Sequence, residues 1–296
     1  MKLLKIFFLF TLIVFIEAEP VNTGHANVSL VKFNYPESEN KNNLIGIKMD
    51  MQKNWHTYWK NPGDSGGPIK IKWDTDENIK IGEIKWPRPE LIPYEPLMTY
   101  GYKDFVIFPF EYIKKDSLNS KIKLNIDFLI CDDVCVPEKA LIETSLDEIA
   151  IDDDLVAWND LVPSVTLPVL AEIHSQFIEL RFSYNDQINL ITFFIADQNI
   201  VDHPGKQILL KEENNWLLKV PIIAGASNLS SINGVLSIND DEIFLINAEV
   251  NNKDVQSSIS FLQAVIFAFI GGLILNLMPC VFPIISLKIL SFVSLG

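Results

Sequence analysis

Apolar side chains occupy every second position of the run from Lys121 to Cys131, and this pattern constrains the fold more than any other feature of the sequence. A period of two is that of a β-strand with one buried face. The apolar members of the run are Ile122, Leu124, Ile126, Phe128 and Ile130. Cys131 therefore ends a predicted strand on the face that points away from the core.

Shorter runs of the same kind recur between turn residues throughout residues 20–258. They lie at 28–33, 45–51, 69–73, 106–110, 177–182, 188–194 and 243–250. Many short strands at such spacing are typical of antiparallel β-sandwiches. We therefore predict a mainly β protein with two β-sandwich domains, at residues 19–150 and 165–255, joined by an acidic connector with a short helix at 151–164. The second domain carries no cysteine and no cluster of catalytic residue types, so we expect it to be a spacer or packing module.

Residues 1–18 have the composition of a signal peptide. Lys2 and Lys5 form a charged start, and an apolar run follows at 6–16. This run is too short to cross a bilayer as a helix, because about eleven residues rise only about 16 Å. Ala18 is a suitable cleavage residue. An uncleaved anchor is the alternative, and in both cases we expect the following segment to be exported.

Residues 259–287 form a second apolar run, which is long enough for a transmembrane helix. Pro279 and Pro283 flank Cys280 inside it. Each proline frees a backbone carbonyl that must find a partner on a neighbouring helix. We therefore expect the first helix of a membrane domain that is truncated at Gly296. A lone buried cysteine is usually an inert small hydrophobe, but the place of Cys280 between two prolines favours a functional role.

Composition excludes several classes of function. The formal net charge of −14 argues against nucleic-acid binding, which needs a basic surface. The four histidines are scattered, so a histidine-based zinc site is not expected. Three cysteines are too few for a disulfide-rich scaffold. We expect no cofactor and no resident metal.

The chemistry of the chain is expected at Cys131 and Cys135. The intervening Asp132-Asp133-Val134 can form a three-residue hairpin loop, which would place the two cysteines opposite each other on neighbouring strands. A disulfide there would close a short ring and remove little entropy from the unfolded chain. A disulfide of this kind adds little stability to the fold. We therefore expect a bond that is broken and formed again during function.

Two other interpretations of the cysteine pair stay open. One is a static disulfide, and the other is a Cu(I) site on two thiolates, which lacks a third ligand nearby in the sequence. Asp132 and Asp133 disfavour a thiolate by charge repulsion, so a reversible dithiol here would react slowly until a partner docks.

Aromatic residues cluster in two places. The first, residues 55–68, surrounds the strong turn sequence Asn61-Pro62-Gly63-Asp64, and we expect core packing beside a tight loop. The second, residues 86–102, is rich in proline and tyrosine. Our hypothesis is that it forms a loop in which Tyr100 shields the cysteine pair from oxidants. Tyr100→Ala would then speed alkylation of the reduced cysteines.

With these motifs in view, the chain resembles the N-terminal part of the transmembrane thiol:disulfide reductases of the DsbD and ScsB type. The resemblance rests on W-H-T-Y-W at 55–59 with N-P-G-D at 61–64, Y-G-Y at 100–102, C-x3-C-V-P-E at 131–138 and G-G-L-I-L-N-L-M-P-C-V-F-P at 271–283. It covers most of the mature chain and weakens between residues 165 and 250.

The resemblance implies immunoglobulin-like sandwiches in the periplasm, anchored in the inner membrane. It implies that the cysteine pair receives electrons from a membrane dithiol and passes them to disulfide isomerases or to thioredoxin-like proteins of cytochrome maturation. In this pattern Cys135 matches the cysteine that forms mixed disulfides, Cys131 the resolving cysteine, and Cys280 the first membrane cysteine.

The chain also departs from the family pattern. It has no second membrane cysteine and no Cys-x-x-Cys of a thioredoxin-like domain. We therefore expect a reductase component that is a fragment, a split-gene product or a remnant, and a separate membrane-domain chain is a further expected partner. The alternatives to thiol–disulfide exchange are a non-catalytic binding module and a copper-handling domain.

Overall fold

The computed structural model describes residues 19–39, 41–115, 120–223, 226, 229–251 and 261–276. The chain divides into two compact units, Met1–Asn251 and Asn252–Gly296. The expected signal peptide at 1–18 and Cys280 lie outside the described residues.

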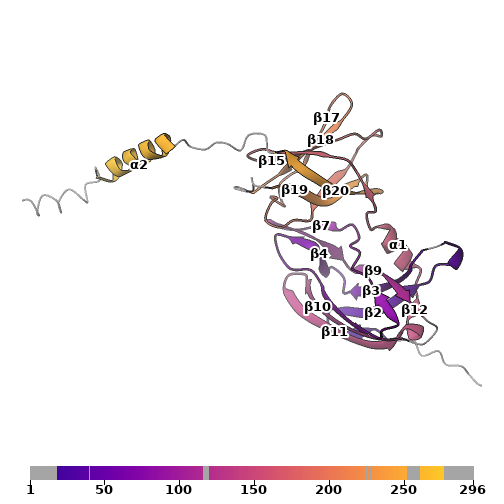
Figure 1. Cartoon of the computed structure of the whole chain (residues 1–296). Coiled ribbons are helices and arrows are strands. Elements are labelled where there is room, and N and C mark those ends of the chain that lie inside the picture. Colours follow the sequence, from indigo (N-terminus) through magenta and orange to yellow (C-terminus); the bar gives the residue numbers. More distant parts are fainter. Residues whose placement is uncertain are drawn as a thin grey trace, which may run out of the picture. The chain divides into compact units, whose positions relative to one another are not determined.

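The first part of the larger unit contains two six-stranded sheets (Figure 1). One has the order β1-β2-β3-β9-β6, with β12 on β2. Its strands are β1 (Val21–Asn22), β2 (Ala26–Phe33), β3 (Asn43–Met51), β6 (Ile79–Ile81), β9 (Phe105–Lys114) and β12 (Ala150–Ile151).

The other sheet has the order β11-β10-β4-β8-β7, with β5 on β10. Its strands are β4 (His56–Gly63), β5 (Lys70–Thr75), β7 (Glu90–Tyr94), β8 (Leu97–Lys103), β10 (Lys121–Cys131) and β11 (Cys135–Ser145). Short 3₁₀ turns lie at Glu37–Glu39 and Leu146–Glu148.

The core confirms the alternation expected for β10. All five apolar side chains from Ile122 to Ile130 are buried in the main hydrophobic cluster. They share this cluster with side chains of the first sheet, among them Ile47 of β3 and Phe108 of β9. The buried face of β10 is thus set by its period of two, and Cys131 lies on its other face.

Two strands share one edge of β10. Strand β4 pairs with β10 at Cys131 and His56, whereas β5 pairs with it from Ile122 to Asp127. The register of β4 against β8 shifts between Tyr58 and Gly63, which marks a bulge or irregularity in this strand pair. The chain between β4 and β5 passes beside the end of β10 that carries Cys131, where Gly67 lies next to the side chain of Leu129.

The remaining strands of the larger unit form one continuous eight-stranded sheet with the order β16-β19-β20-β14-β15-β18-β17, and β13 pairs with β20. They are β13 (Val165–Thr166), β14 (Leu170–Ile173), β15 (Phe177–Phe182), β16 (Ile191–Ile195), β17 (Ile208–Lys211), β18 (Trp216–Pro221), β19 (Ser231–Ile238) and β20 (Glu242–Asn251). We call this sheet with its loops, residues 165–251, the second sandwich.

The mainly β fold is confirmed, and most strand pairs are antiparallel as expected, but three pairs are parallel. Strand β12 runs parallel to β2, and both β13 and β14 run parallel to β20. Parallel neighbours cannot be joined by a tight hairpin, and each of these pairs is far apart in sequence.

The expected helix of the connector is present as α1 (Asp154–Asp160). Its Leu155 is fully buried against Val31, Leu44 and Ile107. A Cβ on Gly46 would lie 2.7 Å from Cδ1 of Leu155, so a glycine is needed there to admit the leucine. The helix is therefore packed on the first sheet rather than extended between domains.

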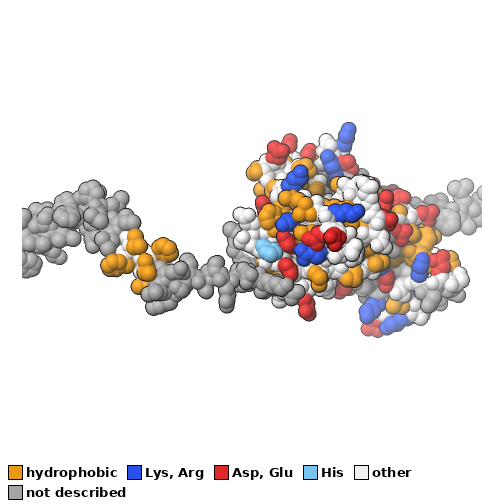
Figure 2. Space-filling view, turned by 90° about the horizontal axis from the view of Figure 1, so that it is seen from above, with side chains coloured by type: hydrophobic (Ala, Val, Ile, Leu, Met, Phe, Trp, Pro, Cys, Tyr) orange, Lys and Arg blue, Asp and Glu red, His pale blue; other side chains and the backbone are white. Residues whose placement is uncertain are grey.

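The smaller unit contains helix α2 (Phe261–Asn276). Its described side chains are hydrophobic and exposed, and Phe267 and Phe269 are 65% and 69% exposed (Figure 2). In the described part of the chain, no helix combines the length and the apolar character that a bilayer crossing requires. The span expected at 259–287 extends beyond α2 into residues that the structure does not describe.

Candidate redox site

The two cysteines face each other at the turn end of the β10–β11 hairpin, on either side of its loop. Cys131 and Cys135 are direct cross-strand partners, and their sulfurs form a disulfide with a Cα–Cα distance of 4.2 Å. Within the loop, the backbone N–H of Asp132 donates to the carbonyl of Val134 at 3.2 Å. The predicted three-residue hairpin loop and the opposition of the cysteines are confirmed.

The two cysteines differ strongly in exposure. Cys131 is 1% exposed, whereas Cys135 is exposed and follows Val134, which is 63% exposed. The cause is their place in the sheet: β11 is an edge strand, whereas β10 is covered on its other side by β4. A thiolate that arrives from solution can therefore reach the sulfur of Cys135 but not that of Cys131.

A tyrosine hydroxyl contacts both sulfurs from inside the protein. Oη of Tyr58 lies 2.6 Å from Sγ of Cys131, to which it donates, and 3.3 Å from Sγ of Cys135. Burial raises the pKa of Tyr58 to about 12, so the hydroxyl keeps its proton at neutral pH. A fixed donor of this kind can stabilise negative charge that develops on sulfur when the disulfide opens.

His56 on β4 lies directly opposite Cys131 where β4 pairs with β10. Its ring packs edge-on against Tyr58, with ring centroids 5.3 Å apart. Burial lowers the pKa of His56, and the negative charge of Asp132 opposes this shift. The imidazole is therefore neutral at pH 7 and acts as part of the packing around Tyr58.

The end of β4 and the turn that follows it lie over Tyr58. We call residues 61–67 the covering segment. Its Gly66 has φ +90°, and a Cβ on this residue would lie 2.1 Å from Cε1 and Cζ of the Tyr58 ring. Asp64 exchanges hydrogen bonds with Met98 of β8: the backbone N–H of Asp64 donates to the Met98 carbonyl (3.0 Å), and Oδ2 of Asp64 accepts from the Met98 N–H (2.8 Å). The strong turn sequence thus holds a glycine directly on the aromatic ring that contacts the disulfide.

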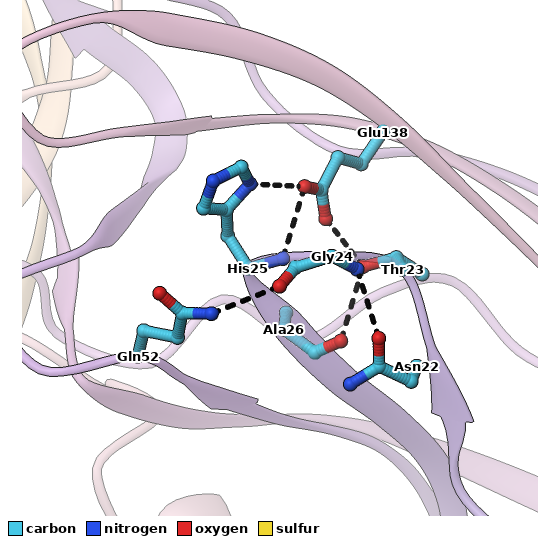
Figure 3. Close-up of polar contacts among 7 residues, drawn as sticks. All are labelled: Asn22, Thr23, Gly24, His25, Ala26, Gln52 and Glu138. Atoms are coloured by element: carbon cyan, nitrogen blue, oxygen red, sulfur yellow. Dashed lines mark hydrogen bonds and ion pairs between the residues drawn. The ribbon is translucent and has the colours of Figure 1, made fainter.

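A buried carboxylate fastens the strand that carries Cys135. Glu138 lies three residues after Cys135 and is 7% exposed. It accepts hydrogen bonds from the backbone N–H of His25 at 3.1 Å and from the hydroxyl of Thr23, and its Oε1 lies 2.6 Å from Nδ1 of His25 (Figure 3). The His25 ring also stacks on Trp55, with centroids 3.9 Å apart. These contacts tie β11 to the turn before β2.

A groove runs beside the exposed cysteine. It has a volume of about 570 Å³, and its walls include Gly67 and Pro68 of the turn, Leu129 of β10, and Pro137 and Lys139 of β11. Its lining combines apolar and charged side chains, which suits a polypeptide segment of a docked protein better than a small cofactor.

Elsewhere in the described part of the chain, three side chains of the kinds that bind metal ions lie close together. Glu172, His174 and Glu179 offer donor atoms within 4.8 Å of one another. Glu179 already pairs with Lys219 at 2.8 Å, and this cation occupies one carboxylate oxygen. The cluster lies on β14, β15 and their connection, in the second sandwich and apart from the cysteines.

The hypothesis that Tyr100 shields the disulfide is wrong, because a different tyrosine contacts the two sulfurs. Residues 90–94 and 97–103 form strands β7 and β8 rather than a loop. Tyr100 lies in the core, where its ring contacts Trp59, Phe194 and His203. The tyrosine that contacts the sulfurs is Tyr58. The alternation of side chains along a strand could have predicted this, because Trp59 faces the core and its neighbour Tyr58 must then lie on the opposite face.

Two comparisons with known proteins found a match. Residues 26–146 match the family model described as thiol:disulfide interchange protein DsbD, N-terminal, so the recognition made from the motifs is confirmed. Among solved structures, the chain resembles the N-terminal periplasmic domain of ScsB from Proteus mirabilis with a TM-score of 0.60 and 17% identity. The alignment covers 78% of this chain and 95% of that one, and at this identity it shows a shared fold. Comparison with curated proteins gave no match.

Proposed function

Starting from the match of residues 26–146 to the DsbD N-terminal family, we propose that this chain performs thiol–disulfide exchange in the periplasm. Its Cys131–Cys135 pair would receive reducing equivalents from a membrane dithiol and pass them to oxidised thioredoxin-like proteins, such as disulfide isomerases or cytochrome-maturation proteins. The apolar run at 259–287 would anchor the chain in the inner membrane, and Cys280 within it would belong to the membrane dithiol.

The observation that carries the proposal is the unequal exposure of the two sulfurs. A donor thiolate attacks Sγ of Cys135, and the electron pair of the broken S–S bond passes to Cys131, which leaves as a thiolate beside the Tyr58 hydroxyl. The second thiol of the donor, as its thiolate, then attacks the donor's own sulfur in the mixed disulfide. This attack forms the donor disulfide and releases Cys135 as a thiolate, and both cysteines take up protons from water.

Delivery to an oxidised partner runs the same steps in reverse. The Cys135 thiolate attacks the partner disulfide and forms a mixed disulfide. Cys131 then attacks Sγ of Cys135, which restores the Cys131–Cys135 bond and releases the reduced partner. In this assignment Cys135 is the cysteine that contacts partners, and Cys131 is the resolving cysteine.

Trapping tests this assignment. We expect Cys131→Ser to accumulate a mixed disulfide with an oxidised thioredoxin-like protein through Cys135, and Cys135→Ser to accumulate none. The opposite result would exchange the two roles. The reduction potential of the wild-type pair should lie above about −300 mV, because structural disulfides typically lie below that value. A pair that resists physiological reductants would make the chain a binding module with a static bond, and tight Cu(I) binding by the reduced pair would indicate copper handling.

A further inference from the structure

One side chain of the covering segment reaches into the second sandwich. Asn61 is completely buried, and its side-chain N–H₂ group donates to the backbone carbonyls of Ile195 at 2.9 Å and Asp197 at 3.1 Å. Its side-chain oxygen accepts from the backbone N–H of Gly63 at 3.1 Å, which shapes the turn. Two of the three hydrogen bonds of this amide therefore join the covering segment to the end of β16 and to Asp197 just after it, and the third lies within the segment.

Aromatic rings of the two parts meet at the same place. Phe194 contacts Trp59 of β4 and Tyr100 of β8, with ring centroids 6.4 Å and 5.2 Å apart. His203 contacts Tyr100 at 4.9 Å. The second sandwich thus packs directly on β4, the strand that carries Tyr58, and on its neighbour β8. A cavity of about 290 Å³ lies between this contact and residues 62–66.

The covering segment has further hydrogen bonds within its own domain, but they do not make it independent of the second sandwich. Ser65 and Asp64 bond to Thr99 and Met98 of β8. The next residue of β8 is Tyr100, whose ring is held by the second sandwich. Every described hydrogen bond of residues 61–65 to another element therefore ends either on the second sandwich or on the strand packed against it.

The other end of the covering segment acts on the redox site. Gly66 lies on the ring of Tyr58, and the hydroxyl of that ring contacts the sulfur of Cys131. A displacement of the segment would free the ring, which buries Cys131. A path therefore leads from the second sandwich to Asn61, along the chain of the covering segment to Gly66, and from there through Tyr58 to the sulfur.

We propose that the second sandwich anchors the covering segment through Asn61, which keeps the sulfur of Cys131 closed to small thiol-reactive reagents and leaves Cys135 as the member of the disulfide pair that partners reach. Asn61 is thus a positioning residue. The purpose of this device rests on the proposed exchange function, but the closure itself is a property of the folded chain. It gives a role to a domain whose sequence predicts only a spacer.

Alkylation of Cys131 tests the proposal without any turnover. The full chain with Cys135→Ser and Cys280→Ser keeps Cys131 as its single thiol. Adding Asn61→Ala should raise the rate of iodoacetamide modification of Cys131 about tenfold, the effect expected for two lost hydrogen bonds in a local opening. Phe194→Leu loosens the same contact from the second sandwich and should act in the same direction, which keeps the test valid if Asn61→Ala does not fold.

Gln207→Ala is the matched control. The Gln207 amide also makes two hydrogen bonds to backbone, to the N–H and the carbonyl of Phe193 at 2.9 Å each, but both remain within the second sandwich. Its removal should leave the alkylation rate within about twofold. The accelerated rate in Asn61→Ala should also be independent of low urea concentrations, because local opening exposes little surface.

Three results would overturn the proposal: an unchanged rate in Asn61→Ala and Phe194→Leu, an equal acceleration in Gln207→Ala, or an acceleration that grows with urea as global unfolding does. The failure of the proposed function is a separate result. It would show in the wild-type chain as a disulfide that exchanges with no thioredoxin-like protein, whatever the alkylation rates are.

Discussion

The hydroxyl of Tyr58 donates to the sulfur of Cys131 across 2.6 Å in the oxidised protein. A disulfide sulfur is a weak acceptor, whereas a thiolate is a strong one. The same hydrogen bond therefore strengthens as the S–S bond breaks and charge develops on Cys131. Interactions that are stronger in the transition state than in the ground state are those that accelerate a reaction.

Tyr58→Phe should slow the reduction of the disulfide by dithiothreitol about tenfold, because a hydrogen bond to a charged group contributes about 1.5–3 kcal/mol. The ring and its packing remain, so the loss is that of the donor. The measurement is the second-order rate constant at pH 7. Tyr102→Phe is the control, since it also removes a buried hydroxyl, which donates to Pro87 at 2.7 Å and not to sulfur. Equal rates for wild type and Tyr58→Phe would exclude a role of the hydroxyl in the exchange.

Gly66→Ala should destabilise the fold by about 1–3 kcal/mol, because alanine is strained at a positive φ and its Cβ would overlap the Tyr58 ring. Urea unfolding of the oxidised protein measures the free energy. Gly67→Ala provides a matched control one residue away: its Cβ would meet only Cδ1 of Leu129 at 3.7 Å, an ordinary contact. If both variants were as stable as the wild type, the glycine at 66 would not be required by the ring.

Glu138→Gln should lower the free energy of unfolding by about 1–3 kcal/mol, because the carboxylate is buried and is bound by Thr23 and His25. Glu143→Gln is the comparison on the same strand. Glu143 pairs with Lys123, but both side chains are about half exposed, so its loss should change stability by less than about 1 kcal/mol. Chemical denaturation of both variants gives the difference, and similar values for the two would show that the Glu138 cluster contributes no more than a surface pair.

Stability should fall as the pH drops from about 7.5 to 5, in part because of His56 and His203. Burial lowers the pKa of both side chains in the folded state. The unfolded chain then binds more protons than the folded one below about pH 6.5, so acid favours unfolding, by at most about 1.4 kcal/mol per pH unit for each histidine. Unfolding free energies at the two pH values should differ less in His56→Gln and in His203→Gln than in the wild type. If the difference in unfolding free energy between the two pH values were the same in both variants as in the wild type, folding would not hinder protonation of either histidine.

Much of the fold follows from local pattern. The alternation of residues 121–131 determined which face of β10 is buried, and the spacing of the cysteines determined that they oppose each other across a hairpin. Both features depend on neighbours in the sequence, so short-range rules were sufficient. The parallel pairs at β12, β13 and β14 could not be derived in this way, because each joins strands far apart in the chain.

By itself, the sequence determined the strands, the hairpin and the pair of cysteines at its end. Only the tertiary structure decided which sulfur is exposed, that Tyr58 rather than Tyr100 contacts it, and that Asn61 bonds to the second sandwich. The physical reason is that exposure and hydrogen-bond partners depend on which strands become neighbours. Strand order in a sheet is set by the burial of the whole core, which no local run of residues specifies.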